Sequence, residues 1–101
     1  MIITAEESVN KIVLGLSGRL DTTTAPQLQK ELLAKIELGQ DIELNFEELN
    51  YVSSAGLRVL LIGEKTAKSK DITMTLINVS EEIMEVFNMT GFANVLRIEG
   101  A

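Results

Sequence analysis

The stretch Tyr51-Val52-Ser53-Ser54-Ala55-Gly56-Leu57-Arg58-Val59-Leu60-Leu61 joins a strand-like run to a helix-like run, and the rest of the chain is organised around it. Serine favours a helix start, because its side-chain oxygen accepts a hydrogen bond from an unpaired amide of the first turn. Gly56 leaves that turn without a side chain, so another backbone segment or a partner can approach closely. The positive end of a helix also tolerates a phosphate. The two serines therefore either cap a helix only or also serve as a switch.

Apolar residues at every second position predict three strands before this stretch. The predicted strands cover residues 1–8, 12–17 and 41–46. The turn at residues 10–11 is short, so the first two strands should pair as an antiparallel hairpin. The segment Gly18-Arg19-Leu20-Asp21 breaks the second strand.

Apolar residues at helical spacing predict three helices. The first follows the candidate N-caps Thr22-Thr23-Thr24 and ends at Gly39, the second runs from Ala55 to about Lys68, and the third lies between Ser80 and Gly91. Pro26 fits the first turn of a helix, where a missing amide hydrogen costs nothing. Gly63 lies inside the second helix and predicts close packing at that point.

Two more predicted strands, at residues 72–76 and 95–98, complete the order β-β-α-β-α-β-α-β. Helical crossovers imply parallel pairing of the later strands, with the first strand antiparallel at an edge. The sequence therefore predicts a single α/β domain over residues 1–101, built on a mixed, mostly parallel sheet.

The composition excludes several classes of function. The 101 residues contain no cysteine and no histidine, which removes Ser-His and Cys-His catalysis and most transition-metal sites. A net charge of −6, one tyrosine and no tryptophan argue against a nucleic-acid surface, so proteins are the expected partners. No apolar run is long enough to span a membrane, and a cytoplasmic protein is expected. We predict no enzymatic activity, cofactor or metal.

Three segments match a known family. They are Gly18-Arg19-Leu20-Asp21 with Thr24-Ala25-Pro26, the run from Tyr51 to Leu61, and Thr90-Gly91-Phe92. In this order, and with the predicted strands and helices between them, they make the chain resemble the STAS domains. This fold is shared by anti-sigma factor antagonists and the cytoplasmic tails of sulfate transporters. The group that the chain resembles most is the small bacterial anti-sigma factor antagonists.

The resemblance implies a partner-switching function. Such proteins bind an anti-sigma factor in their unphosphorylated form and thereby free a sigma factor. The anti-sigma factor is also a serine kinase, which phosphorylates the antagonist at the helix start, and a metal-dependent serine phosphatase restores the active form. The alternative is a constitutive STAS subunit of a phospholipid-transport ATPase or a signalling scaffold.

The family pattern also implies a modified residue. Well-known members carry Asp-Ser-Ser-Gly or Asp-Ser-Thr-Gly, and aligning that glycine with Gly56 places Ala55 where one acceptor serine or threonine would be. Ser54 falls at the other acceptor position, and Ser53 replaces the aspartate. We therefore predict phosphorylation of Ser54, with Ser53 as the alternative. Asn45 replaces a second aspartate, which the family often has at the end of the third strand.

The expected binding surface borders the serines. Its candidate residues are Asp21, Thr22, Thr23, Tyr51, Ser53, Ser54, Gly56 and Arg58. For Asp21 the alternative is a turn or cap role before the first helix. An exposed first strand could pair with a second copy, so we expect a monomer or a weak dimer.

Overall fold

A computed structural model describes residues 1–99 and confirms the predicted element order. The strands are β1 (Ile2–Glu7), β2 (Lys11–Leu20), β3 (Asp41–Val52), β4 (Met74–Ile77) and β5 (Arg97–Ile98). The helices are α1 (Ala25–Ile36), α2 (Ser54–Ser69) and α3 (Glu81–Thr90), followed by the short 3₁₀ turn η1 (Phe92–Asn94). Residues 100 and 101 of the expected domain lie outside the described residues.

The five strands form one mixed sheet in the order β1-β2-β3-β4-β5. The first pair is antiparallel, with Ile2 opposite Ser17, and the three later pairs are parallel. This arrangement confirms the predicted hairpin and the predicted α/β class. Parallel neighbours also place the carboxyl ends of β2 and β3 at the same edge of the sheet.

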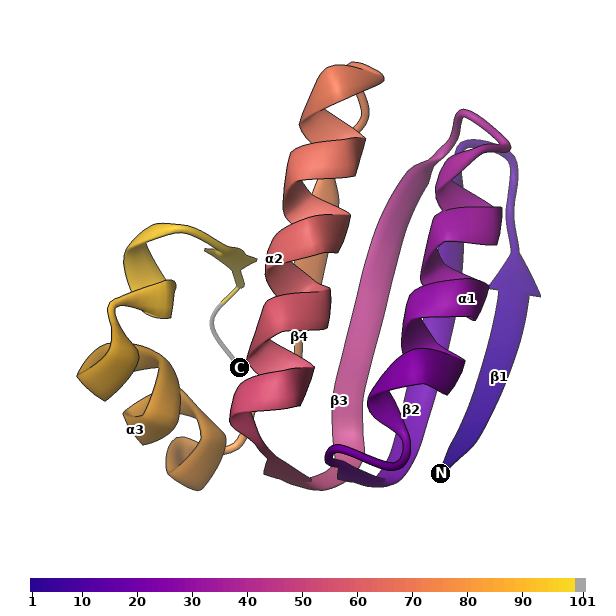
Figure 1. The fold of residues 1–101 in the computed structure, drawn as a ribbon. Coiled ribbons are helices and arrows are strands. Elements are labelled where there is room, and N and C mark those ends of the chain that lie inside the picture. Colours follow the sequence, from indigo (N-terminus) through magenta and orange to yellow (C-terminus); the bar gives the residue numbers. More distant parts are fainter. Residues whose placement is uncertain (100–101) are drawn as a thin grey trace.

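The core lies between one face of the sheet and the helices. Every second residue is buried on that face from Ile12 to Leu16 of β2 and from Ile42 to Phe46 of β3, and α1 and α2 lie side by side across it (Figure 1). Phe46 of β3 and Phe87 of α3 are fully buried, and their ring centroids are 6.3 Å apart. No helix within residues 1–99 has the length and apolarity needed to cross a membrane.

Gly63 allows α2 to pack closely against its neighbours, as predicted. A Cβ atom at this position would lie 2.5 Å from Cδ2 of Leu32 in α1 and 3.0 Å from the sulfur of Met74 in β4. Real Cβ atoms essentially never come within 3.0 Å of another atom, so the Leu32 side chain would have to move. The glycine therefore fixes the distance between the two helices and the sheet.

Two strands are longer than the sequence predicted. β2 continues through Gly18 to Leu20, and β3 continues from Phe46 to Val52. The pairing of β2 with β3 shifts between Gly15 and Ser17 and again after Gly18, so that β3 carries extra residues. Such bulges interrupt the alternation of buried and exposed residues, which is why the pattern in the sequence ended too early.

Asn45 was expected at the end of the third strand. In the structure it lies inside β3, seven residues before the strand ends at Val52. Its side-chain oxygen accepts hydrogen bonds from the amide of Glu47 and from the side chain of Asn78, both at 3.0 Å. The residue therefore supports the irregular part of β3 and the loop after β4, away from the two serines.

The last elements differ in length from the prediction. β4 begins at Met74 instead of Ile72, and β5 contains only Arg97 and Ile98 of the predicted strand 95–98. The caps of α3 are as predicted, since the Ser80 hydroxyl accepts a hydrogen bond from the Ile83 amide and Gly91 has the left-handed conformation.

Candidate functional site

Two loops meet at the carboxyl ends of β2 and β3, at the lower end of the molecule in Figure 1. The amide of Ser53 donates a hydrogen bond of 2.8 Å to the carbonyl oxygen of Leu20, the last residue of β2. This bond joins the start of α2 to the turn that leads into α1. In open α/β sheets, binding sites lie at such strand ends.

The two serines have different surroundings. Ser53 is the N-cap of α2, and its partly buried side chain accepts a hydrogen bond of 3.3 Å from the amide of Gly56. Ser54 is the first residue of the helix and is exposed. Within residues 1–99 its hydroxyl forms no hydrogen bond. The structure therefore assigns the capping role to Ser53 and leaves the Ser54 hydroxyl accessible.

Gly56 is buried directly beneath this turn. A Cβ atom there would lie 2.6 Å from Cγ of Leu20 and 3.1 Å from its carbonyl oxygen. The close approach predicted for this glycine is therefore made by Leu20 of the same chain. Gly56 shapes the turn from below, whereas the other predicted binding residues lie at or near the surface.

Asp21 organises the turn between β2 and α1. Its Oδ1 atom accepts hydrogen bonds from the Thr23 hydroxyl at 2.8 Å and from the amides of Thr23 and Thr24 at 3.0 and 3.1 Å. Thr24 occupies the N-cap position of α1, but its hydroxyl bonds to Asp21 and Arg19 and does not cap the helix. Asp21 thus has the turn role that was its alternative interpretation.

The hydrogen bonds to Asp21 lower the pKa of its carboxyl group. The largest cause is the bond from the Thr23 hydroxyl, while partial burial acts in the opposite direction. A lowered pKa in the folded state stabilises the turn at neutral pH, and this stabilisation is lost as the pH falls through that pKa.

Arg19 and Tyr51 form a pair that the sequence did not reveal. They are partners in the register of β2 and β3, and the Arg19 guanidinium lies 4.1 Å from the centre of the Tyr51 ring. Arg19 Nε is also 3.7 Å from Oδ2 of Asp21. The cation thus links the turn that contains Asp21 to the strand that leads into the serines.

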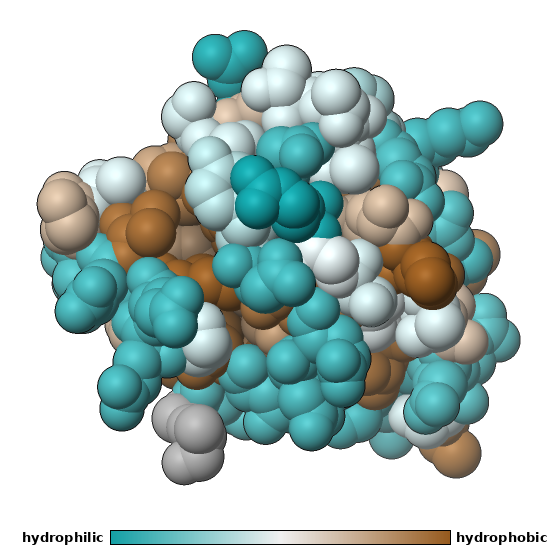
Figure 2. Space-filling view, turned by 90° about the horizontal axis from the view of Figure 1, so that it is seen from below, coloured by the Kyte–Doolittle hydropathy of each residue, from teal (hydrophilic) through white to brown (hydrophobic). Residues whose placement is uncertain are grey.

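The surface at this end has a mixed character. Figure 2 shows strongly hydrophilic groups at its centre, near-neutral residues around them and hydrophobic side chains to either side. Thr22, Thr23, Tyr51 and Arg58 are exposed, so four of the predicted binding residues are accessible together with Ser54. Residues 1–99 contain no group of three or more acidic, histidine or cysteine side chains placed to hold a metal ion.

The model of the STAS domain family matches residues 2–100. The chain belongs to the STAS domain family. The anti-sigma-B factor antagonist of Bacillus subtilis (strain 168) is 27% identical over 96 residues, which cover 95% of this STAS domain and 88% of that protein.

Solved structures show the same fold. The unphosphorylated form of the anti-sigma factor antagonist SpoIIAA is 22% identical, with a TM-score of 0.76 over 99% of this STAS domain and 89% of that chain. The phosphorylated form of the Bacillus cell fate determinant SpoIIAA has a TM-score of 0.74 at 22% identity, over 98% and 92% of the two chains.

The substitution Gly56→Ala should destabilise this STAS domain by about 1–3 kcal/mol, because the new methyl group overpacks a fully buried leucine. Thermal or chemical unfolding measures this loss. The double variant with Leu20→Ala should lose less stability than the sum of the losses in the two single variants, because the truncated leucine makes room for the methyl group. Strict additivity would contradict the contact between the two residues.

The substitution Thr23→Val should raise the pKa of the Asp21 carboxyl towards its ordinary value, because it removes the hydroxyl that lowers this pKa most. An NMR titration of the Asp21 side-chain carbon measures the change. Thr22→Val is the matched control, because Thr22 forms no hydrogen bond with Asp21 within the described residues. An equal shift in both variants would show that the Thr23 hydroxyl is not the cause.

Proposed function

We propose that the chain is an anti-sigma factor antagonist whose unphosphorylated form binds an anti-sigma factor with serine kinase activity and thereby frees a sigma factor. Phosphorylation of Ser54 ends this binding, and a serine phosphatase restores it. The protein acts in the cytoplasm as a binding module, without catalysis of its own and without contact to nucleic acid.

The exposure of Ser54 at the first position of α2 is the observation that carries this proposal. A kinase needs a free hydroxyl at an accessible site, and the neighbouring Ser53 is partly buried and engaged as the cap. The names of related proteins give the function its class, since the Bacillus subtilis relative is an anti-sigma-B factor antagonist.

The start of α2 can hold a phosphate without unfolding. A phosphoserine adds roughly −1.5 to −2 charges, which the positive end of a helix stabilises. The first turn of α2 contains no acidic residue, and the exposed Arg58 lies one turn after Ser54 on the same helix. Residues four positions apart are neighbours on a helix surface, so the guanidinium can pair with the phosphate.

The same phosphate opposes binding. The exposed Thr22, Thr23, Tyr51 and Arg58 lie on the segments that meet at this end of the sheet, so a partner that covers them also covers Ser54. A doubly charged group inside such an interface must lose its hydration water, and this loss costs free energy. Asp21, Ser53 and Gly56 contribute by fixing the shape of the two loops.

A pull-down from the lysate of the host, with wild type, Ser54→Asp and Ser53→Asp as baits, tests this function. Mass spectrometry identifies the retained proteins and maps any phosphate on the bait. We expect wild type to retain an anti-sigma factor of the kinase type, and Ser54→Asp to lose it. Loss only with Ser53→Asp would move the site to Ser53. Equal retention of a transport ATPase by all three baits would instead support a constitutive STAS subunit.

A further inference from the structure

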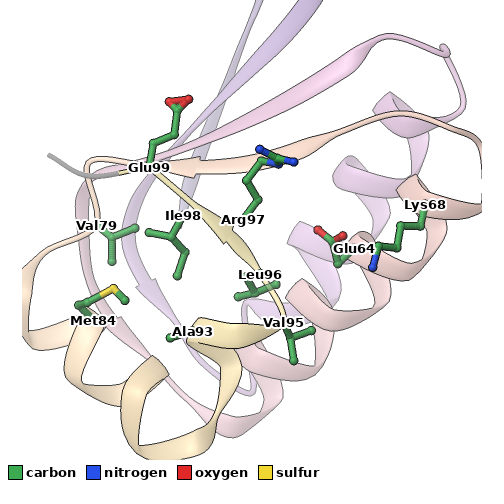
Figure 3. A pocket seen from close by; sticks show the side chains of 10 residues that line it. All are labelled: Glu64, Lys68, Val79, Met84, Ala93, Val95, Leu96, Arg97, Ile98 and Glu99. Carbon is green, nitrogen blue, oxygen red and sulfur yellow. The ribbon is translucent and has the colours of Figure 1, made fainter.

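A concave site lies away from the serines, between the C-terminal half of α2, α3, η1 and β5. It has a volume of about 650 Å³, which falls within the roughly 300–1,000 Å³ of small-molecule sites. Val79, Met84, Ala93 and Ile98 give it an apolar wall, and Leu96 closes the side towards the core (Figure 3). This wall is formed by side chains from four separate segments, and the predicted function does not use it.

The charged residues of this site point to the chemistry of its ligand. Glu64 and Lys68 project from α2 towards the space that Arg97 enters from β5, and Glu99 lies at the far end (Figure 3). Two acidic and two basic side chains leave the lining without net charge. A neutral ligand therefore fits it better than an ion.

One oxygen of Glu64 lacks a partner. Its Oε1 atom is buried, and no group in residues 1–99 donates a hydrogen bond to it. An acceptor that is removed from water without a partner costs free energy, which a donor on a ligand would recover. Lys68 and Arg97 are the cations of the lining, yet neither forms a hydrogen bond with this atom.

We propose that this site binds a small neutral molecule with an aromatic or aliphatic body and one N–H or O–H group, which donates a hydrogen bond to Glu64 Oε1. The body lies against the apolar wall, and the donor points to α2. This ligand site is independent of the proposed partner switch at Ser54.

Fluorescence titration with N-phenyl-1-naphthylamine tests the proposal, because this probe is neutral, carries a single N–H group and becomes brighter in apolar surroundings. We expect a dissociation constant below about 100 µM for the wild-type protein. Ala93→Phe places a ring in the cavity and should weaken binding at least tenfold. Ala34→Phe, the same change at an exposed position of α1, should leave the affinity unchanged.

The N-methyl derivative of the probe tests the role of Glu64, because it keeps both aromatic groups but lacks the donor. It should bind wild type about tenfold more weakly than the parent probe, and the difference should vanish in Glu64→Leu. This comparison also decides the matter if Ala93→Phe fails to fold. The sulfonated analogue, 8-anilino-1-naphthalenesulfonate, should bind more weakly than the neutral probe.

Three results would overturn the proposal. The first is no binding of the neutral probe at about 100 µM, the weakest affinity expected. The second is equal affinity of the wild-type protein for the probe and for its N-methyl derivative. The third is tighter binding of the sulfonate than of the neutral probe. The first would exclude the site, the second would exclude the hydrogen bond to Glu64, and the third would exclude a neutral ligand.

Discussion

Phosphorylation of Ser54 should weaken binding to the anti-sigma factor by about 100- to 1,000-fold, which corresponds to a penalty of about 3–4 kcal/mol. The reason is local, because the phosphate occupies the exposed first position of α2 in the middle of the proposed interface. Isothermal titration calorimetry with the purified partner measures both forms. Ser54→Asp carries a smaller charge than phosphate, so we expect a weaker effect of about 10- to 100-fold.

Two controls separate this switch from a loss of structure. Ser8→Asp adds the same charge in the exposed turn between β1 and β2, at the opposite end of the strands, and should leave binding unchanged. The melting temperature of Ser54→Asp should stay close to that of wild type, because the helix start tolerates negative charge. Full binding by the phosphorylated protein would refute Ser54 as the switch.

The substitution Phe46→Ala should destabilise the fold by about 3–5 kcal/mol, as expected for loss of a fully buried aromatic side chain. The ring packs against Phe87 and thereby attaches α3 to the part of β3 that lies beyond its pairing with β4. Domains of this size have a free energy of unfolding of only about 5–15 kcal/mol, so this substitution would remove a large part of it. Urea denaturation followed by circular dichroism measures the change.

Tyr51→Ala is the matched control for this prediction, because it removes an aromatic side chain from the same strand. Tyr51 is 40% exposed, and its main contact is the Arg19 guanidinium, so the loss should stay below about 1 kcal/mol. If the two variants were equally stable, Phe46 would not hold α3 to the sheet.

The sequence predicted the helices and the order of the strands well, because their signals are local. The hydroxyls of Ser53 and Ser80 each accept a hydrogen bond from an amide three residues later, and Gly91 ends α3 in the left-handed conformation, as expected. The length of β3 could not be read in the same way. Its bulges depend on pairing with β2, and pairing between distant segments leaves no periodic trace in either strand.

Only part of the candidate site could be predicted, because only some of its contacts are local in the sequence. Ser53, Ser54 and Asp21 follow from turn and cap chemistry, and the structure brings them together through the bond between Ser53 and Leu20. The stacking of Arg19 on Tyr51 depends on the strand register, and the contact of Gly56 with Leu20 depends on packing. The hollow beside β5 combines residues from four segments, so no single stretch of sequence could indicate it.

The hydrogen bond between the Ser53 amide and the Leu20 carbonyl group joins the two loops through their backbones, so it does not depend on which side chains the loops expose. Backbone groups, the bonds from Thr23 to Asp21 and the buried Gly56 hold the two loops, whereas Thr22, Tyr51 and Arg58 are exposed and lie outside the core. Those three positions can therefore diverge at little cost in stability. Duplicated copies of such a domain can acquire different partners within one cell, and signalling pathways built on the same fold can remain insulated from one another.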